Sequence, residues 1–408
     1  MEESGWTRVA RDADLAEAVP VAVAVGEEKV LLARVHGKLY AVGHKCPHYE
    51  EKLENGALFG TEIVCKSHLA RMDLTTGKFL SAPAYNDLPT YPVKVEAGEV
   101  WVGPVVKPKF PKPAAALGSD PRTFLIVGAG GAGNMAAEAL RRHGFAGRIV
   151  MVTAEAERPY DRPNLSKDFL TGKIDDDYLH LHGPKFYATQ GIELLTGRRA
   201  VSLDTAGKTL TLEGGEKLAF DRALLATGGT PRKLAVPGAD GPGVYALRSA
   251  EDARAILSAV AQWKSAVLVG AGFIGLELAG SLREKGVEVT VVAPEALPLA
   301  SILGDRVGAY VKSLHESRDV RFLMQRTVSR IEGEAGAKVV HLSDGARLSA
   351  GFLVVGVGIV PAVDYLAGTG LVENGAVPVD SGMRTRAPDI YAAGDIAAVP
   401  DPDWERRR

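Results

Sequence analysis

The sequence contains very little cysteine. Only two of its 408 residues are cysteines, Cys46 and Cys65, and both lie in the first sixth of the chain. Two thiols are too few for a secreted scaffold held together by disulfides. They are also too few for a four-cysteine zinc site or a four-cysteine iron–sulfur ferredoxin.

The chain also lacks an excess of one charge and a long hydrophobic run. Lys and Arg number 48 and Asp and Glu number 50, which gives a net charge of −2 and no electrostatic reason to expect nucleic acid. The longest apolar run, Phe352 to Val363, is interrupted by glycines and is far shorter than the roughly 20 residues of a membrane span. The N-terminal residues are acidic and have none of the basic and apolar regions of a signal peptide. We therefore expect a cytoplasmic protein with no membrane span and no nucleic-acid partner.

The first 105 residues consist of short β-branched or alternating segments separated by Gly and Pro. Tight hairpin turns are expected at His36-Gly37 and Ala97-Gly98. This pattern predicts a small all-β domain over residues 1–105, with one short helix at 14–18 and strands at 19–25, 29–35, 38–42, 62–65, 91–96 and 99–102. The proline-rich residues 106–121 that follow indicate a stiff linker.

After the linker the pattern changes to alternating strands and helices. A strand at 123–127, a glycine-rich turn, a helix ending at 142 and a strand at 148–152 form one βαβ unit. The same arrangement returns with a strand at 266–269, a helix ending at 285 and a strand at 288–292. Two such units predict two α/β Rossmann-like domains, so the expected fold class is multidomain, with a small all-β domain followed by two α/β domains.

Both cysteines have a histidine close behind them. The two segments are Cys46-Pro47-His48 and Cys65-Lys66-Ser67-His68, a C-x-H and a C-x-x-H pattern. The ligand chemistry alone permits zinc in a site of two cysteines and two histidines. Zinc fingers, however, usually place both cysteines on one arm, whereas each arm here carries one cysteine and one histidine. A pair of irons, one bound by two thiolates and one by two imidazoles, can take one ligand of each kind from each arm, which is the ligand set of a Rieske 2Fe–2S centre.

With these segments, and with Asp73–Gly77 and Pro83 downstream, residues 1–105 resemble the Rieske ferredoxin family. The resemblance implies a 2Fe–2S cluster whose metal ligands are Cys46, His48, Cys65 and His68. The chain departs from the family pattern in two places. Glu50-Glu51-Lys52-Leu53 stands where Gly-Ala-Pro-Leu is common, and Lys66-Ser67 stands where Pro-Trp is common. Such positions shape the hydrogen bonds and solvent access of a cluster, and therefore its reduction potential.

Two glycine-rich fingerprints follow the first strand of each α/β unit. Gly128, Gly130 and Gly133 form a G-x-G-x-x-G motif between a strand and a helix, the context in which the backbone approaches a pyrophosphate at a helix N-terminus. An acid at the end of the second strand should then hold a ribose, and Glu155 is the candidate. The second fingerprint consists of Gly270, Gly272 and Gly275.

Further motifs lie outside the fingerprints. The basic residues of Pro159–Lys167 indicate either a solvated loop or contacts to a diphosphate or an electron-rich ring. Together with Ala226–Arg232 and Tyr391–Asp395, they make residues 122–408 similar to the two-dinucleotide flavoprotein reductases of the pyridine nucleotide-disulfide oxidoreductase superfamily. The closest branch is that of the ferredoxin reductases and apoptosis-inducing-factor-like proteins, in particular its Rieske-fused members.

The resemblance implies a division of the chain and a set of roles. Residues 122–244 would be the first part of an FAD-binding domain, 245–357 an NAD(P)H-binding domain, and 358–408 a second, shortened part of the FAD-binding domain. The implied FAD contacts are Gly128, Gly130 and Gly133 at the pyrophosphate, Glu155 at the ribose, Arg162 at the diphosphate, Lys167 near the flavin N5, Ala226, Thr227, Gly228 and Arg232 around the cofactor, and Asp395 at the ribityl hydroxyls. The implied NAD(P)H contacts are Gly270, Gly272 and Gly275, Glu277 near the nicotinamide, and Glu295, which favours NADH.

The expected function is that of an FAD-dependent NAD(P)H oxidoreductase. No cysteine pair remains for a flavin-linked dithiol of the glutathione-reductase type. The expected path therefore runs from NAD(P)H through FAD to the cluster or to an external acceptor, with Lys167 and Glu277 as the catalytic candidates. The candidate acceptors are a ferredoxin, a cytochrome and an oxygenase. Two alternatives stay open, an NADH oxidase whose Rieske domain is a sensor or docking module, and a redox-responsive signalling protein resembling apoptosis-inducing factor with slow NADH turnover.

Overall fold

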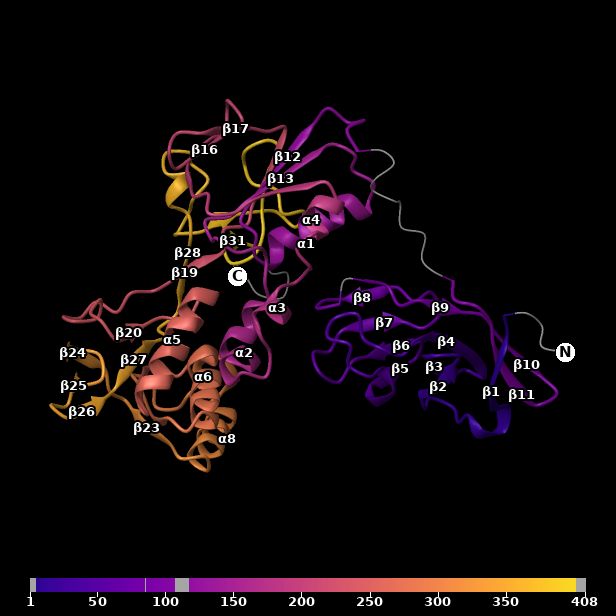
Figure 1. Ribbon diagram of the computed structural model, residues 1–408, viewed down its shortest axis with the longest axis horizontal. Coiled ribbons are helices and arrows are strands. Elements are labelled where there is room, and N and C mark those ends of the chain that lie inside the picture. The colour runs from indigo at the N-terminus through magenta and orange to yellow at the C-terminus, as the bar shows by residue number, and fades with distance from the viewer. Residues whose placement is uncertain (1–4, 85, 107–116, 401–408) are drawn as a thin grey trace. The chain divides into compact units, whose positions relative to one another are not determined.

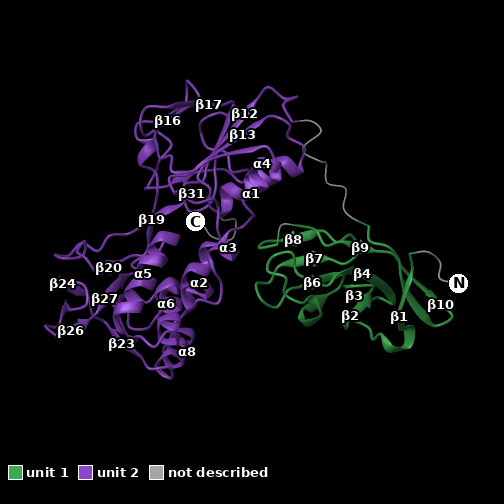
Figure 2. Ribbon diagram, viewed as in Figure 1, with its two compact units in different colours: residues 1–110 green, residues 111–408 purple. Residues whose placement is uncertain are grey.

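The structure is a computed structural model that describes residues 5–84, 86–106 and 117–400. It divides into two compact units, residues 1–110 and 111–408 (Figure 2), and each is described by itself. Most of the expected linker and the C-terminal arginines lie outside the described residues.

The first unit is built from three antiparallel sheets (Figure 1). Their orders are β1-β11-β10, β2-β3-β4-β9 and β5-β6-β7-β8. The strands are β1 (Thr7–Arg11), β2 (Val21–Val25), β3 (Glu28–Val35), β4 (Lys38–Gly43), β5 (Ala57–Phe59), β6 (Glu62–Val64), β7 (Arg71–Asp73), β8 (Phe79–Ser81), β9 (Thr90–Tyr91), β10 (Val93–Glu96) and β11 (Glu99–Val102). The expected all-β domain is thereby confirmed.

The hairpin turns of this unit also match the expectation. His36 and Gly37 have φ angles of 52° and 74°, and Ala97 and Gly98 have φ angles of 51° and 78°. Two consecutive residues with positive φ define the turn whose twist suits a two-residue hairpin. The turns therefore fix the register in which β3 pairs with β4 and β10 with β11.

The expected helix at 14–18 is wrong. The structure has a short 3-10 helix at Asp12–Asp14 instead, and the chain beyond it is attached to β3. Arg34 of β3 donates to the carbonyl oxygens of Leu15 and Asp12, at 3.1 Å each, and accepts the N–H of Ala18 on its own carbonyl at 2.8 Å. These hydrogen bonds to a neighbouring strand replace the i to i+4 bonds that a helix would need.

The second unit contains two parallel five-stranded sheets, β14-β13-β12-β18-β30 and β20-β27-β21-β22-β23. Their strands are β12 (Thr123–Val127), β13 (Arg148–Val152), β14 (Ile192–Leu195), β18 (Arg222–Leu225), β20 (Val244–Tyr245), β21 (Ser265–Val269), β22 (Glu288–Ala293), β23 (Val320–Met324), β27 (Phe352–Val355) and β30 (Ile390–Ala392). The helices are α1 (Gly131–Arg142), α2 (Asp168–Thr171), α3 (Asp176–Leu179), α4 (Phe186–Thr189), α5 (Ala250–Gln262), α6 (Phe273–Glu284), α7 (Ala300–Leu303) and α8 (Asp305–Glu316). The expected α/β organisation is confirmed.

Each parallel sheet is accompanied by an antiparallel meander that the sequence patterns did not predict. The meanders are β15 (Ala200–Asp204), β16 (Thr209–Leu212) and β17 (Lys217–Ala219), and β24 (Val328–Glu332), β25 (Lys338–Leu342) and β26 (Arg347–Ala350). Two-stranded pairs complete the unit, β19 (Gly229–Pro231) with β28 (Ile359–Pro361), and β29 (Val377–Pro378) with β31 (Ala397–Ala398).

The central strands are buried on both faces, which is why they are continuous apolar runs. Residues Leu125 to Val127 of β12 and Ile149 to Val152 of β13 are all at most 2% exposed. One face packs on α1 and α4 and the other on the antiparallel strands at 200–204 and 209–212, and parallel strands covered on both faces need such sequences. Among the described residues, no helix is both long and apolar enough to cross a membrane.

We expect Arg141→Met to destabilise the second unit by about 2–4 kcal/mol. Arg141 is 2% exposed, and its guanidinium donates to four main-chain carbonyls, those of Phe145, Gly147, Gln190 and Gly191, at 2.7–2.8 Å. The substitution leaves these oxygens buried without a donor. Urea unfolding followed by circular dichroism measures the effect.

The matched control is Arg148→Met, which removes an exposed guanidinium that pairs with Glu193 at the surface. A surface ion pair contributes only about 0–1 kcal/mol. Equal destabilisation by the two substitutions would contradict the structural role assigned to Arg141.

Candidate functional site

The two cysteines lie in loops with the same hydrogen-bonding pattern. In each loop the cysteine N–H donates to the carbonyl five residues on, at 2.8 Å from Cys46 and 2.9 Å from Cys65. The N–H four residues on donates back to the cysteine carbonyl, at 3.0 Å in both loops. That fourth residue, Glu50 or Leu69, has a positive φ of 52° or 61°. Main-chain hydrogen bonds alone therefore close each loop around its own cysteine, without a metal.

The four predicted metal ligands converge from these loops. Cys46 and Cys65 are 1% and 2% exposed, and burial raises the pKa of the Cys46 thiol to about 11. The Nδ1 atoms of His48 and His68 lie 3.2 Å apart. Two nitrogens that bind one metal ion at about 2.1 Å have a separation close to this. Burial, together with the neighbouring His68, lowers the pKa of His48, which favours the neutral ring that a metal requires.

The arrangement discriminates between the two metal sites that the sequence permits. Within the described ranges, no three side chains of His, Cys, Asp or Glu are grouped as ligands of a single ion. A structural zinc ion needs four protein ligands, whereas each iron of a two-iron centre held by two cysteines and two histidines needs two. The two thiols are in contact with each other, as are the two imidazoles, and this pairing fits the second case. The assignment of the four residues as ligands stays a prediction.

The first nucleotide fingerprint forms a tight turn between β12 and α1. Gly128 has a φ of +110°, and a Cβ atom there would overlap the carbonyl oxygen of Ala226. A Cβ atom on Gly133 would overlap the carbonyl oxygen of Gly128, so the first turn of α1 lies directly on the end of β12. Both positions need glycine for packing, independently of any cofactor.

The second fingerprint repeats this geometry. Gly270 has a φ of +109°, and Cβ atoms on Gly270 and Gly275 would overlap the carbonyl oxygens of Gly356 and Gly270. The middle glycines, Gly130 and Gly272, differ because a Cβ atom there would meet nothing within 4 Å. These two residues are also the N-caps of α1 and α6, where no side chain caps the helix. The helix N-termini therefore offer N–H groups to an approaching phosphate.

The two predicted catalytic residues are in contact. Lys167 Nζ lies 2.8 Å from Glu277 Oε2, and Ser166 Oγ donates to the same oxygen at 2.6 Å. Lys167 directly precedes α2 and Glu277 lies in α6, so this pair connects the two nucleotide-binding parts of the unit. Both side chains stay partly exposed, at 45% and 35%.

The predicted ribose and diphosphate contacts are paired with each other. Arg162 donates to Glu155, to the Tyr160 hydroxyl at 2.8 Å and to the Arg248 carbonyl at 2.7 Å. Tyr160 also donates to Glu155, and burial raises the pKa of its phenol. The roles of Glu155 and Arg162 toward FAD stay predictions, and binding in those roles would require this pair to open.

The remaining predicted FAD contacts lie around the C-terminal end of β18. Asp395 forms an ion pair with Arg248 at 3.0 Å, and Gly228 lies beside both side chains. Thr227 donates to the Ala362 carbonyl at 2.8 Å. The Arg232 N–H donates to Gly358 at 2.9 Å, and Ala226 is the residue that packs on Gly128. Glu295, the predicted NADH contact, is exposed just beyond β22.

Three residues of this region were not predicted, Ser166, Tyr160 and Arg248. The sequence offered a signal for one of them. Ser249 and Asp252 form a capping box at the start of α5, so Arg248 directly precedes a helix N-terminus. Tyr160 and Ser166 lie inside the basic segment Pro159–Lys167, and only the fold shows their contacts.

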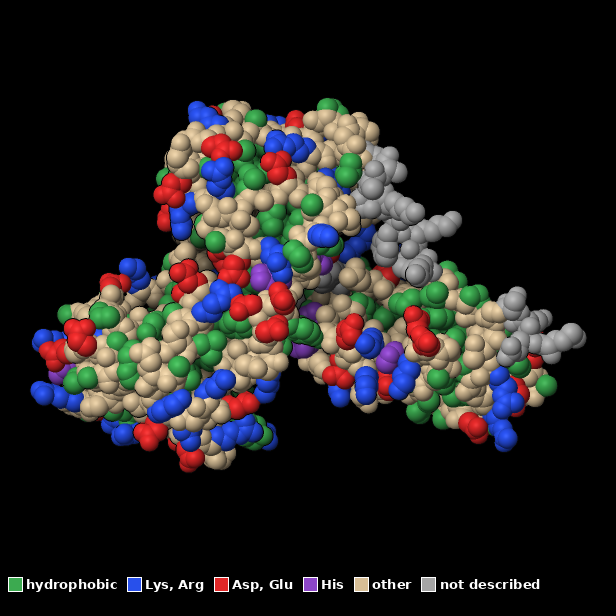
Figure 3. All heavy atoms as spheres, in the orientation of Figure 1, with side chains coloured by type: hydrophobic (Ala, Val, Ile, Leu, Met, Phe, Trp, Pro, Cys, Tyr) green, Lys and Arg blue, Asp and Glu red, His purple; other side chains and the backbone are tan. Residues whose placement is uncertain are grey.

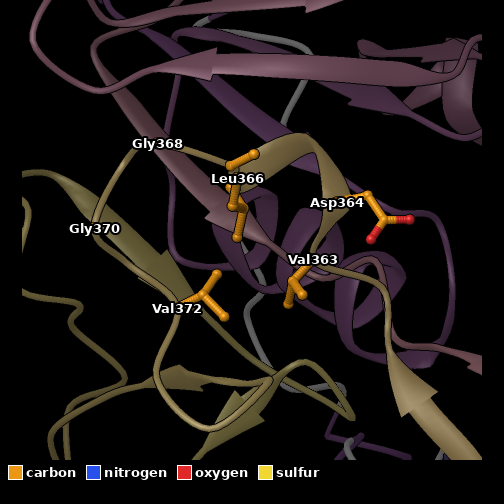
Figure 4. A pocket seen from close by; sticks show the side chains of 7 residues that line it. Val363, Asp364, Leu366, Gly368, Gly370 and Val372 are labelled. Atoms are coloured by element: carbon orange, nitrogen blue, oxygen red, sulfur yellow. The ribbon is translucent and has the colours of Figure 1, made fainter.

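A hollow on the surface begins one residue beyond Ala362, whose main chain is hydrogen-bonded to the predicted FAD contacts Thr227 and Gly228. Figure 4 shows this hollow, of about 650 Å³, lined by one segment, Val363, Asp364, Leu366, Ala367, Gly368, Gly370 and Val372. None of the predicted site residues is among these seven. Figure 3 shows Lys and Arg interspersed with Asp and Glu on the visible surface, in keeping with the net charge of −2.

Comparison with known families decides the classification. Residues 122–407 match the family described as pyridine nucleotide-disulphide oxidoreductase. The chain belongs to this family. Residues 5–92 match the Rieske [2Fe-2S] domain, so this oxidoreductase-family chain also contains a Rieske domain. The family implies FAD and a pyridine nucleotide, and the Rieske domain implies a 2Fe–2S cluster, as the sequence motifs predict.

Relatives of this oxidoreductase-family chain fall into two groups. Apoptosis-inducing factor 3 of Homo sapiens is 37% identical over 392 residues, covering 93% of this chain and 64% of that protein. Rhodocoxin reductase of Rhodococcus erythropolis is 38% identical over 281 residues, covering 69% of this chain and 66% of that protein. The chain thus spans about two thirds of the length of these relatives or slightly less.

Two solved structures of ferredoxin-reductase type are also similar to this family member. The ferredoxin reductase for the CYP199A2 system from Rhodopseudomonas palustris is 35% identical, covers 70% of this chain and 71% of that one, and has a TM-score of 0.67. The covalent putidaredoxin reductase–putidaredoxin complex is 30% identical with the same TM-score, at 70% coverage of both chains.

We expect Gly130→Ala and Gly133→Ala to act differently. A methyl group on Gly133 collides with the main chain and should lower the unfolding temperature of the unit by several degrees. A methyl group on Gly130 has room, so the unfolding temperature of the FAD-free protein should stay unchanged while FAD affinity falls. Thermal unfolding and FAD titration by flavin fluorescence measure the two effects. Equal FAD affinity in Gly130→Ala and the parent protein would contradict the assignment of this turn to the pyrophosphate.

Proposed function

We propose that this protein is an NAD(P)H oxidoreductase that passes electrons through FAD to the 2Fe–2S cluster of its own Rieske domain or to an external one-electron acceptor. The observation that carries this proposal is the placement of the thiols. Both cysteines of the chain lie in the two ligand loops of the Rieske domain. The nucleotide-binding unit therefore has no dithiol, and its electrons need another route.

The residues of the chain support this function by binding and by charge. FAD, when bound, supplies hydride acceptance from NAD(P)H and release of single electrons. The uncapped N-termini of α1 and α6 would bind the two diphosphates. Glu277 and the Pro163 carbonyl hold the Lys167 ammonium, at 2.8 and 3.1 Å. A positive charge fixed in this way stabilises negative charge that develops on a neighbouring ring.

The relatives support an iron–sulfur protein as the external acceptor. One relative is the ferredoxin–NAD(+) reductase component of the biphenyl dioxygenase system of Paraburkholderia xenovorans, 37% identical over 278 residues. Another has been solved in covalent complex with putidaredoxin. We propose a ferredoxin as the external acceptor, NADH as the favoured nucleotide because of Glu295, and the cytoplasm as the compartment.

A second candidate function rests on the relative that matches both units. Apoptosis-inducing factor 3 aligns with 93% of this chain, which includes the Rieske domain. In this alternative the protein is a redox-responsive signalling protein with slow NADH turnover. Rapid NADH-dependent reduction of ferricyanide or cytochrome c would favour the oxidoreductase. A slowly decaying complex of reduced flavin with NAD would favour the signalling role.

Anaerobic titration of the purified full chain with NADH tests the proposed function. The flavin absorbance should bleach, and the paramagnetic signal of a reduced Rieske cluster should appear in the low-temperature EPR spectrum. A bleached flavin with no such signal, in protein that contains the cluster, would exclude the electron path through the Rieske domain.

We expect His68→Ala to abolish the cluster signal and to leave NADH-dependent ferricyanide reduction intact. Ferricyanide takes electrons from flavin directly, whereas cytochrome c reduction through the cluster should be lost. His36→Ala, in an exposed hairpin turn of the same unit, is the control. Retention of a normal cluster signal in His68→Ala would remove His68 from the ligand set.

Lys167→Met should lower kcat with NADH and ferricyanide by about tenfold, because the positive charge beside the flavin is lost. Lys173→Met is the matched control. Lys173 also contacts α6, through Glu284 at 3.0 Å, and its side chain is 56% exposed. Steady-state kinetics measures the effect. Similar kcat values for both variants would show that Lys167 acts only as a surface ion pair.

A further inference from the structure

One carboxylate bridges the two ligand loops of the Rieske domain. Glu51 lies in the first loop, and its Oε2 accepts a hydrogen bond from Ser67 Oγ of the second loop at 2.8 Å. Its Oε1 lies 3.6 Å from the Lys66 ammonium. The main-chain carbonyl of Glu51 is also the acceptor for the Cys46 N–H, at 2.8 Å. Glu51 therefore closes the first loop through its main-chain carbonyl and binds the second loop through its side chain.

This bridge joins the positions at which the chain departs from the Rieske pattern. Glu51 stands where alanine is common in the family, and Lys66 and Ser67 stand where proline and tryptophan are common. An alanine at position 51 would leave the Ser67 hydroxyl without this acceptor, so the bridge depends on the carboxylate of Glu51 together with the short donor side chain of Ser67. The departures in the two loops are therefore complementary to each other.

The carboxylate is held in its charged form. Its oxygens accept from Ser67 Oγ at 2.8 Å and from the Lys52 N–H at 3.0 Å, and the Lys66 ammonium lies 3.6 Å away, all of which favour an ionised carboxylate. About 27% of the Glu51 side chain is exposed, so the charge lies at the rim of the site rather than in open solvent. Glu50 differs, because its carboxylate is 76% exposed and pairs with Lys45 of its own loop at 2.6 Å.

We propose that Glu51 is a positioning residue that clamps the two ligand loops together through Ser67 and places a fixed negative charge beside the cluster. The clamp holds the histidines at the separation that one iron requires. The charge favours the oxidised cluster, which lowers its reduction potential. This inference rests on the proposed function only in so far as the cluster is the electron acceptor.

Four variants of the full chain separate the clamp from the charge. Glu51→Ala removes both, Ser67→Ala removes the hydrogen bond and keeps the charge, and Glu51→Gln keeps an acceptor for Ser67 and removes the charge. Glu50→Gln is the control, because it removes a carboxylate of the same loop that does not reach the second loop.

Loss of cluster absorbance in the presence of an iron chelator measures the clamp. We expect loss about tenfold faster in Glu51→Ala and about fivefold faster in Ser67→Ala, as a lost charge-assisted hydrogen bond implies. The double variant should lose its cluster no faster than Glu51→Ala, because the two side chains act through one bond. Glu50→Gln should match the parent chain. Unchanged rates in both single variants, or fully additive effects, would overturn the clamp.

Redox titration of the cluster measures the charge. In Glu51→Gln the ratio of reduced to oxidised cluster at a fixed applied potential should rise by about three- to tenfold, the size of one partly screened charge at close range. Ser67→Ala should change this ratio less than Glu51→Gln does, because it keeps the carboxylate. No rise in Glu51→Gln would overturn the electrostatic part of the proposal.

These measurements do not depend on NADH. A cluster that forms and titrates but is not reduced by NADH would defeat the proposed function and leave the clamp standing. The clamp can also be tested in protein without a cluster, since the Glu51–Ser67 bond does not involve a metal. There the double-mutant cycle is measured on the thermal unfolding of the metal-free chain. Absence of coupling there would overturn the clamp as well.

Discussion

The position of the two thiols constrains how this protein can carry electrons. Both cysteine side chains are buried in loops that close on themselves through main-chain hydrogen bonds at 2.8–3.0 Å. These loops also bring two imidazoles to a nitrogen separation of 3.2 Å. If both thiols bind the cluster, as predicted, the chain has no thiol pair left to react with a flavin. The family to which the chain belongs is named for disulfide chemistry, yet this member has no cysteine in its nucleotide-binding unit.

The nucleotide-binding unit depends on a second constraint, the close approach of helix and strand at Gly128–Gly133 and at Gly270–Gly275. At both turns a side chain larger than glycine would overlap a main-chain carbonyl oxygen. The strand, the turn and the uncapped helix N-terminus therefore have the same geometry in both halves of the unit. The contact between Lys167 and Glu277 then connects the two halves at 2.8 Å. The catalytic role expected of these two residues stays a prediction.

Much of this arrangement could be predicted from local patterns. The bounds of β12, α1 and β13 follow from apolar runs and glycine placement, and both hairpin turns follow from a residue–glycine pair. The meanders β15–β17 and β24–β26 were missed because each strand has only three to five residues, too few for a clear sequence pattern, and their apolar side chains pack on the parallel sheets. The helix expected at 14–18 does not form because Arg34, distant in sequence, makes hydrogen bonds with the main chain of that segment.

In the candidate site, too, local sequence patterns predict some features, whereas contacts between distant residues determine others. The residue types and spacing of Cys46, His48, Cys65 and His68 indicated the cluster without any structure. The partners that hold functional side chains were not visible in this way, since Glu51 with Ser67, Glu155 with Arg162, and Asp395 with Arg248 are contacts across loops. The sequence shows two separate segments that depart from the family pattern, and only the fold shows that Glu51 of one contacts Ser67 of the other.

The most direct test of the central claim is anaerobic stopped-flow reduction of the full chain by NADH, followed at the flavin and cluster absorbances over a tenfold range of protein concentration. Cluster bleaching should follow flavin reduction at a rate independent of protein concentration, because both centres belong to one chain. A cluster that stays oxidised after the flavin is reduced, or one that bleaches at a rate proportional to protein concentration, would contradict electron transfer within the chain.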